Sequence, residues 1–117
     1  MSLSTVADYV NSTRIMLQDQ KAGAYRYTDA EIILALNYAL LETRRIRPDM
    51  YIGYPKVPVQ SFTVNDATPV LFEESYRMAL VYFMAGYTQL KDDETNQDTR
   101  ATIFMNKFVA QLTKIEA

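Results

Sequence analysis

The chain has 117 residues, of which 49% are hydrophobic and 22% are charged, proportions typical of a globular domain and not of a disordered segment. Its 12 basic and 14 acidic residues give a net charge of −2, so the bulk charge provides no attraction to nucleic-acid phosphates. Cysteine and histidine are absent, which excludes disulfides, thiolate zinc sites and histidine catalysis, and no cofactor is expected.

The N-terminal residues contain neither the basic nor the apolar region of a signal peptide. The longest apolar run, from Met78 to Tyr87, has about half of the ~20 residues that a membrane-spanning helix needs. We therefore expect a soluble protein made in a reducing cytoplasm, without a membrane partner.

The first predicted helix covers about residues 5–18. Thr5-x-x-Asp8 resembles an N-terminal cap, with an acidic residue in the first turn. Apolar residues then recur at helical spacing as far as Leu17. The segment 21–24, which contains a glycine, ends the pattern.

The second predicted helix covers about residues 29–47. Thr28-x-x-Glu31 is a capping box, in which each side chain satisfies a free backbone N–H of the helix start. Pro48 ends the helix, because the residue before a proline is disfavoured in the helical conformation. Between these limits, leucine and isoleucine residues surround most of the circumference.

Residues 51–72 differ in character, because Pro55, Pro58 and Pro69 interrupt any helix. Hydrophobic residues flank polar ones up to Val64, and Asn65-Asp66 begins a turn. This pattern predicts a β-hairpin or an extended arm.

The last two predicted helices cover about residues 74–90 and 97–115. The third follows Glu73 and Glu74, whose charges suit a helix N-terminus, and it is apolar on nearly every side. The fourth has one clean apolar stripe, made by Ala101, Phe104, Met105, Phe108, Leu112 and Ile115.

These patterns predict one mainly α domain over residues 1–117, a four-helix bundle with a short β-hairpin or extended arm between the second and third helices. A chain of this length can enclose one helix fully, whereas two of the predicted helices are apolar nearly all round. The remaining apolar surface, with nine tyrosines and six methionines, is typical of protein contact surfaces. Self-association and a monomer with ordinary exposed aromatic residues both remain open.

Charged residues are concentrated at the end of the second predicted helix, in Arg44-Arg45-Ile46-Arg47-Pro48-Asp49. These arginines either contact acidic groups of another protein, or Arg47 pairs within its own subunit and clamps the helix to the turn between the third and fourth helices. The acidic residues of that turn lack calcium-loop spacing, so no metal site is expected there. We assign the clamp to Asp49, Asp92, Asp93, Asp98 and Arg100.

Several of these segments together resemble one family. They are Tyr25-Arg26-Tyr27-Thr28-Asp29-Ala30-Glu31, Arg44-Arg45-Ile46-Arg47-Pro48-Asp49, Tyr76-Arg77-x-Ala79-Leu80, Asp92-Asp93-Glu94 and Asp98-x-Arg100-Ala101. In their order along the chain they are similar to the small helical head–tail adaptor proteins (head-completion or connector proteins) of tailed bacteriophages. The resemblance covers nearly the whole chain.

The resemblance implies a non-enzymatic virion protein that forms a ring, usually twelvefold, beneath the portal at the head–tail interface. Such a ring extends the DNA channel, helps retain packaged DNA without reading its sequence, and docks the tail or nozzle. In such proteins the C-terminal part commonly engages the portal, which here implies contacts from Lys107, Gln111, Lys114 and Ile115.

Other candidate contact residues come from the loops. Tyr51 and Tyr54 would insert between ring neighbours or face the tail, or they would belong to a surface loop that covers the bundle end. Arg26, between two tyrosines, would either stack on an aromatic ring or bind a partner.

Two other functions compete with the adaptor. The arginines Arg44, Arg45 and Arg47 would suit a DNA-binding helical regulator, but they lie at the C-terminal end of their helix, whereas groove-reading residues usually lie toward the N-terminal end. A hydrolase would need two paired carboxylates. Candidate acids are Glu31, Glu42, Glu73 and Glu74, but no motif sets a pair.

Overall fold

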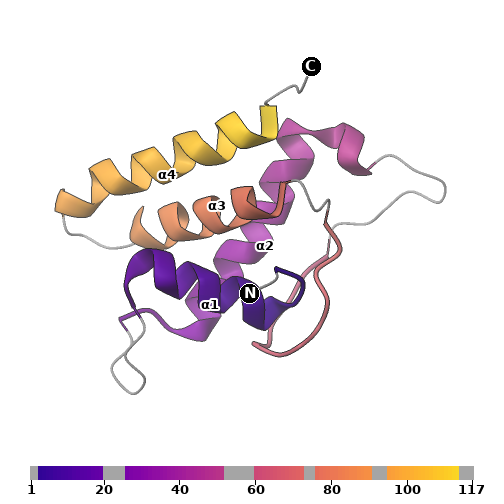
Figure 1. The fold of residues 1–117 in the computed structure, drawn as a ribbon, viewed down its shortest axis with the longest axis horizontal. Coiled ribbons are helices and arrows are strands. Elements are labelled where there is room, and N and C mark those ends of the chain that lie inside the picture. The colour runs from indigo at the N-terminus through magenta and orange to yellow at the C-terminus, as the bar shows by residue number, and fades with distance from the viewer. Residues whose placement is uncertain (1–2, 20–25, 52–59, 73–75, 91–94, 114–117) are drawn as a thin grey trace.

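The computed structural model describes residues 3–19, 26–51, 60–72, 76–90 and 95–113. It contains four α-helices, α1 (Val6–Leu17), α2 (Asp29–Ile46), α3 (Arg77–Leu90) and α4 (Thr95–Thr113), and the 3-10 helix η1 (Pro48–Tyr51). The predicted mainly α, four-helix arrangement is confirmed (Figure 1).

The first two helices begin at the predicted caps. The side chain of Thr5 accepts a hydrogen bond from the backbone N–H of Asp8, and the Thr28 hydroxyl accepts one from Glu31 N–H; both capping boxes are complete. Helix α1 ends at Gln18, which has a left-handed backbone conformation (φ 59°, ψ 38°). Local sequence signals therefore place these helix ends to within about a residue or two, as is usual for caps.

Helix α3 lies at the centre of the domain and runs antiparallel to α4 (Figure 1). The two helices approach closely at Gly86, where an added Cβ would lie only 3.1 Å from the backbone oxygen of Ala101. Of the described α3 side chains, Met78 is the one large apolar group that is clearly exposed. The sequence predicts two helices that are apolar nearly all round, and the subunit itself covers this one apart from Met78.

Residues 60–72 form an irregular segment with no strand, so the predicted hairpin is not seen in this part of the arm; residues 52–59 lie outside the described residues. The segment bonds to the start of α1 instead. The N–H groups of Val6 and Ala7 donate to the carbonyl oxygens of Thr68 (3.0 Å) and Asp66 (2.9 Å), next to an isolated bridge between Thr5 and Pro69. The first turn of a helix has free N–H groups, and this segment satisfies two of them.

Two amide side chains hold residues 60–72 in place. Asn37 of α2 donates to the carbonyl oxygen of Phe62 and accepts from its N–H, both at 2.8 Å. Gln60 accepts from the N–H of Leu71 at 2.7 Å and donates to the carbonyl oxygen of Pro69. Each amide pairs with backbone groups as a neighbouring strand would, so the segment is fixed without a β-ladder.

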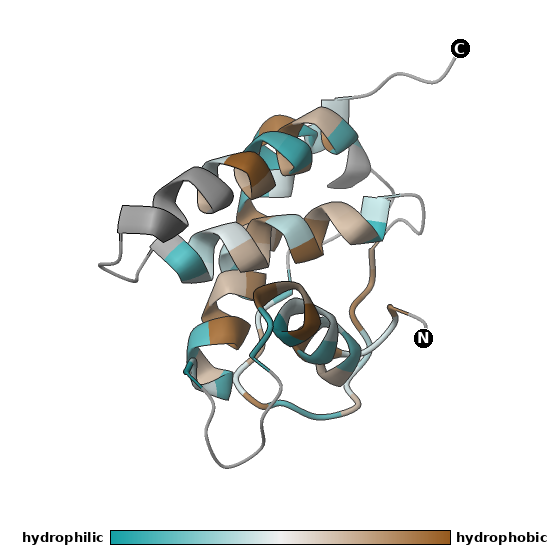
Figure 2. Cartoon of the chain, turned by 60° about the vertical axis from the view of Figure 1, so that its left-hand side comes forward, coloured by the Kyte–Doolittle hydropathy of each residue, from teal (hydrophilic) through white to brown (hydrophobic). Residues whose placement is uncertain are grey.

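Apolar and polar positions alternate along the helices (Figure 2). The buried side chains form one continuous core to which all four helices and Phe62 and Val70 of the irregular segment contribute. The Cα radius of gyration is 14.1 Å, close to the ~13 Å expected for a compact domain of this length.

Candidate interaction surfaces

A buried charged cluster ties α1, the start of α2 and the irregular segment together. Arg14 is 4% exposed, and its guanidinium contacts Asp19 (Nη1 to Oδ2, 2.8 Å) and Asp29 (Nη2 to Oδ1, 2.6 Å). It also donates to the carbonyl oxygen of Tyr27 at 3.0 Å. Asp19 in turn accepts from the backbone N–H groups of Arg26 and Tyr27.

The sequence reasoning missed Arg14. A signal for it exists, because Arg14 falls at helical spacing between Val10 and Leu17, inside the apolar stripe of α1. A single arginine in such a stripe needs a buried acidic partner. The cluster extends to the irregular segment through Asn65, which donates to Asp29 Oδ2 at 3.2 Å. Donation from Arg14, and secondarily from Asn65, lowers the pKa of Asp29.

Arg47 pairs with Asp49 through two hydrogen bonds, Nε to Oδ1 at 3.0 Å and Nη2 to Oδ2 at 2.9 Å. Its third contact is with the carbonyl oxygen of Leu112, and its guanidinium carbon lies 5.3 Å from the ring centre of Tyr76. Leu112 is at the C-terminal end of α4, 17 residues or about 25 Å along the helix from its start. These contacts include the predicted pair with Asp49 and join the end of α2 to the end of α4. The other predicted clamp partners, Asp92 and Asp93 in the turn before α4, lie outside the described residues.

The other arginines of the predicted cluster and Arg26 lie at the surface. Arg45 makes hydrogen bonds with Glu42, one turn earlier on α2, and its side chain is 70% exposed. Arg44 is half-buried. The guanidinium carbon of Arg26 lies 5.8 Å from the ring centre of Tyr27. Of the two predicted roles of Arg26, this contact corresponds to stacking on an aromatic ring.

The predicted portal-facing residues of α4 are partly described. Lys107 is exposed, and its ammonium lies 5.3 Å from the ring centre of Tyr82, while Gln111 is half-buried. Tyr54, Asp92, Asp93, Lys114 and Ile115 lie outside the described residues, as do the side chains of Tyr51, Asp98 and Arg100.

The outer face of α2 carries an apolar ridge, formed by Leu34, Tyr38 and Leu41, which are 37%, 38% and 53% exposed. Their spacing of four and three residues places them in one line along the helix. The opposite side of α2 packs on α1 and α3, so Leu34 and Leu41 face away from both helices, whereas Tyr38 lies beside α3. At its edge, the ring of Tyr38 contacts that of Tyr87 in a T-shaped arrangement, 5.2 Å between centres.

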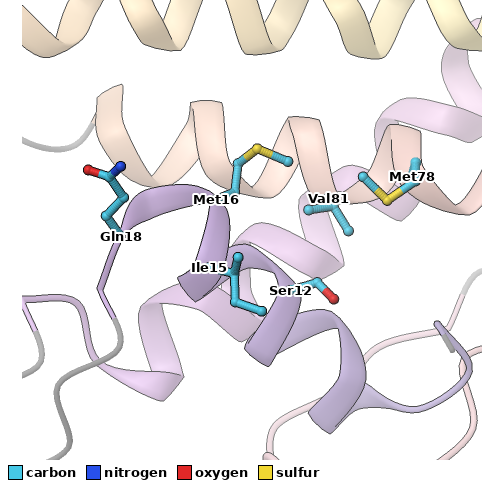
Figure 3. Close-up of a pocket in the computed structure, with 6 residues that line it drawn as sticks. All are labelled: Ser12, Ile15, Met16, Gln18, Met78 and Val81. Carbon is cyan, nitrogen blue, oxygen red and sulfur yellow. The ribbon is translucent and has the colours of Figure 1, made fainter. Parts of the chain in front are cut away.

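A second apolar surface lies between α1 and α3. It is an open groove of about 390 Å³ lined by Ser12, Ile15, Met16, Gln18, Met78 and Val81 (Figure 3). Val81 is fully buried, whereas Ile15 and Met78 are 47% and 41% exposed. Methionine side chains adapt easily to the shape of a partner, which suits this groove to protein contact.

Several acidic side chains in the described residues have local structural roles. Glu31 completes the capping box of α2, and Glu42 pairs with Arg45. Asp8 accepts hydrogen bonds from the backbone of Ser4 and Thr5, which lower its pKa. Of the carboxylates considered for hydrolysis, Glu73 and Glu74 lie outside the described residues. Within the described ranges, no three His, Cys, Asp or Glu residues are grouped as metal ligands.

No protein-family model, curated protein or solved structure matches the chain. Of the helices within the described residues, none has the length and apolar character required to cross a membrane.

Proposed function

We propose that the chain is a structural adaptor subunit of a tailed bacteriophage, which assembles as a twelvefold ring between the portal and the tail or nozzle. The subunit acts in the virion after assembly in the host cytoplasm. The ring extends the channel through which DNA passes, and a mildly acidic subunit suits this role because it does not retain phosphates.

The observation that carries the proposal is the pair of apolar surfaces on different sides of one small subunit. The α2 ridge lies on the outer side of α2, with Tyr38 at its edge toward α3, and the α1–α3 groove lies between those two helices. A ring requires a head-to-tail interface, in which two different surfaces of each subunit meet. The ridge of one subunit and the groove of the next provide such a pair.

The arginine cluster supports an adaptor more than a DNA-binding protein. Arg47 is engaged by Asp49 and by the end of α4, and Arg45 by Glu42. These contacts fix the end of α2, from which the ridge extends. Arg47 is consequently a poor probe of partner contacts, because its substitution would also disturb the fold.

The proposal predicts that the chain adds to the portal ring of its phage as twelve 13.5 kDa subunits, which native mass spectrometry measures directly. Leu41→Glu on the ridge and Ile15→Glu in the groove should each abolish this addition while leaving the fold intact, because both side chains are about half exposed. Introducing a charge into an apolar contact leaves it desolvated without a partner.

The matched control is Val64→Glu, which changes an exposed apolar residue on neither surface. It should retain the wild-type stoichiometry. A portal that takes up the Leu41→Glu and Ile15→Glu variants as fully as the wild type would contradict the assigned surfaces, and absence of wild-type binding would contradict the proposed function.

A further inference from the structure

The charges along the outer face of α2 have an order that is complementary to itself. Glu31 lies at the start of the face, Arg45 lies at its end, and the apolar ridge of Leu34, Tyr38 and Leu41 lies between them. At about 100° per residue, these five side chains fall within one narrow arc of the helix. Within the chain, Glu31 bonds with Thr28 and Arg45 pairs with Glu42, but both pairs lie at the surface, where such pairs contribute little and give way to a partner. The order along the face is thus acidic, apolar and basic.

We propose that the free chain forms a two-fold pair in which the α2 ridge packs antiparallel against the α2 ridge of a second copy. In this arrangement Glu31 faces Arg45 of the second copy at both ends, and leucine faces leucine between them. A parallel arrangement would place Glu31 beside Glu31 and Arg45 beside Arg45. Opposite charges at an interface select the register, and the antiparallel helix dipoles add to the same preference.

The spacing of these residues along α2 determines where the two-fold axis lies. Tyr38 is seven residues from both Glu31 and Arg45, and Leu34 and Leu41 lie nearly symmetrically about it. The face is about 21 Å long, from 14 helical rises of 1.5 Å. The axis therefore passes close to Tyr38, so that the two tyrosines meet at the centre of the pair.

The exposed area of the ridge predicts a weak contact between the two copies. Three partly exposed side chains provide less than the about 800 Å² per partner that a specific, stable interface buries. A pair of this size lies at the low end of specific interfaces and dissociates on dilution. It also covers a ridge that the proposed ring needs, so pair and ring are alternative states. This last consequence rests on the proposed function, whereas the pairing itself does not.

The experiment uses single cysteines, because the chain has none of its own. A disulfide requires two Cα atoms within about 7 Å, so it reports the register directly. Under mild oxidation, Tyr38→Cys should form a covalent dimer of twice 13.5 kDa. Leu34→Cys alone and Leu41→Cys alone should form no covalent dimer, because like positions lie about 9–12 Å apart along the helices at 1.5 Å per residue.

An equimolar mixture of Leu34→Cys and Leu41→Cys should cross-link, because these positions face each other in the antiparallel pair. Sedimentation equilibrium of the cysteine-free chain gives an independent measurement, in which the weight-average mass rises with concentration and Leu41→Glu removes the rise. Far-ultraviolet circular dichroism verifies that each variant is folded.

Three results would overturn the pairing. A Leu34→Cys protein that cross-links to itself as readily as Tyr38→Cys would indicate a parallel or non-specific contact. A mixture of Tyr38→Cys and Ile15→Cys that cross-links while Tyr38→Cys alone does not would place the ridge in the groove of the next copy, which removes the pair and supports the ring. A mass of 13.5 kDa at every concentration would exclude self-association of the free chain. Loss of portal binding with normal Tyr38→Cys dimers would reject only the proposed function.

Discussion

Replacing Arg14 with alanine is expected to lower the free energy of unfolding by about 3–5 kcal/mol, the range for breaking a buried ion pair from one side. The reason is the environment of Asp19, which is 8% exposed and contacts the guanidinium at 2.8 Å. Without Arg14 this carboxylate stays buried with only backbone N–H donors. Chemical unfolding followed by circular dichroism measures the loss.

The control is Arg45→Ala. It also removes a helical arginine that has an ion pair, but this arginine is exposed. Its effect should stay below about 1 kcal/mol, because exposed pairs contribute little. Similar losses for the two variants would show that the Arg14 cluster does not hold the structure together.

The dependence of the free energy of unfolding on pH, at acidic pH, gives a second measurement of what the Arg14 cluster contributes. Arg14 lowers the folded-state pKa of Asp29 below 3.8, so the charged form is favoured in the folded protein. The resulting stability is complete above the unfolded-state pKa and is lost as the pH falls through the folded-state pKa. In Arg14→Ala this acid-dependent loss should be smaller than in the wild type.

Replacing Phe108 with alanine is expected to cost about 3–5 kcal/mol of unfolding free energy, the usual range for a buried phenylalanine. Phe108 is 2% exposed, and its ring meets that of Phe83 at 4.9 Å in a T-shaped arrangement, so the substitution removes an aromatic contact between α4 and α3. The two helices already approach closely at Gly86, so a movement of α4 toward α3 to fill the cavity would crowd that contact. Thermal and urea unfolding measure the change.

The neighbouring residue provides the control. Val109 is 45% exposed on the other side of α4, and Val109→Ala should change stability by less than about 1 kcal/mol. If Phe108→Ala unfolds with a midpoint close to that of Val109→Ala, the packing between α3 and α4 is not what stabilises this half of the domain.

The parts of the fold that the sequence predicts are those set by neighbouring residues. The capping box of Thr28 and Glu31 and the proline at position 48 define α2 as residues 29–46, against a prediction of 29–47. The composition of residues 51–72 predicts a β-hairpin or an extended arm, because it suits strands. The backbone groups of the irregular segment instead bond to the start of α1, about 60 residues earlier, and no local pattern contains that information.

The exposed and buried faces of the helices likewise divide into those that the local sequence predicts and those that depend on tertiary packing. The periodicity of α2 predicts that it is apolar nearly all round, and its outer ridge is indeed uncovered. The equally apolar α3 is enclosed because α1, α2 and α4 all pack on it, an arrangement that depends on tertiary packing. Likewise the contact of Arg47 with Asp49 follows from two residues nearly adjacent in sequence, whereas its contact with Leu112 requires the relative placement of α2 and α4.

The central claim is that protein partners cover the apolar surfaces which this subunit leaves open. Hydroxyl-radical footprinting of assembled particles and of the dilute free chain tests it residue by residue. We predict that Leu41 on the ridge, and Ile15 and Met78 in the groove, lose most of their reactivity on assembly, whereas Val64 keeps its own. Ridge and groove residues that react as fast in the particle as in the free chain would contradict the claim.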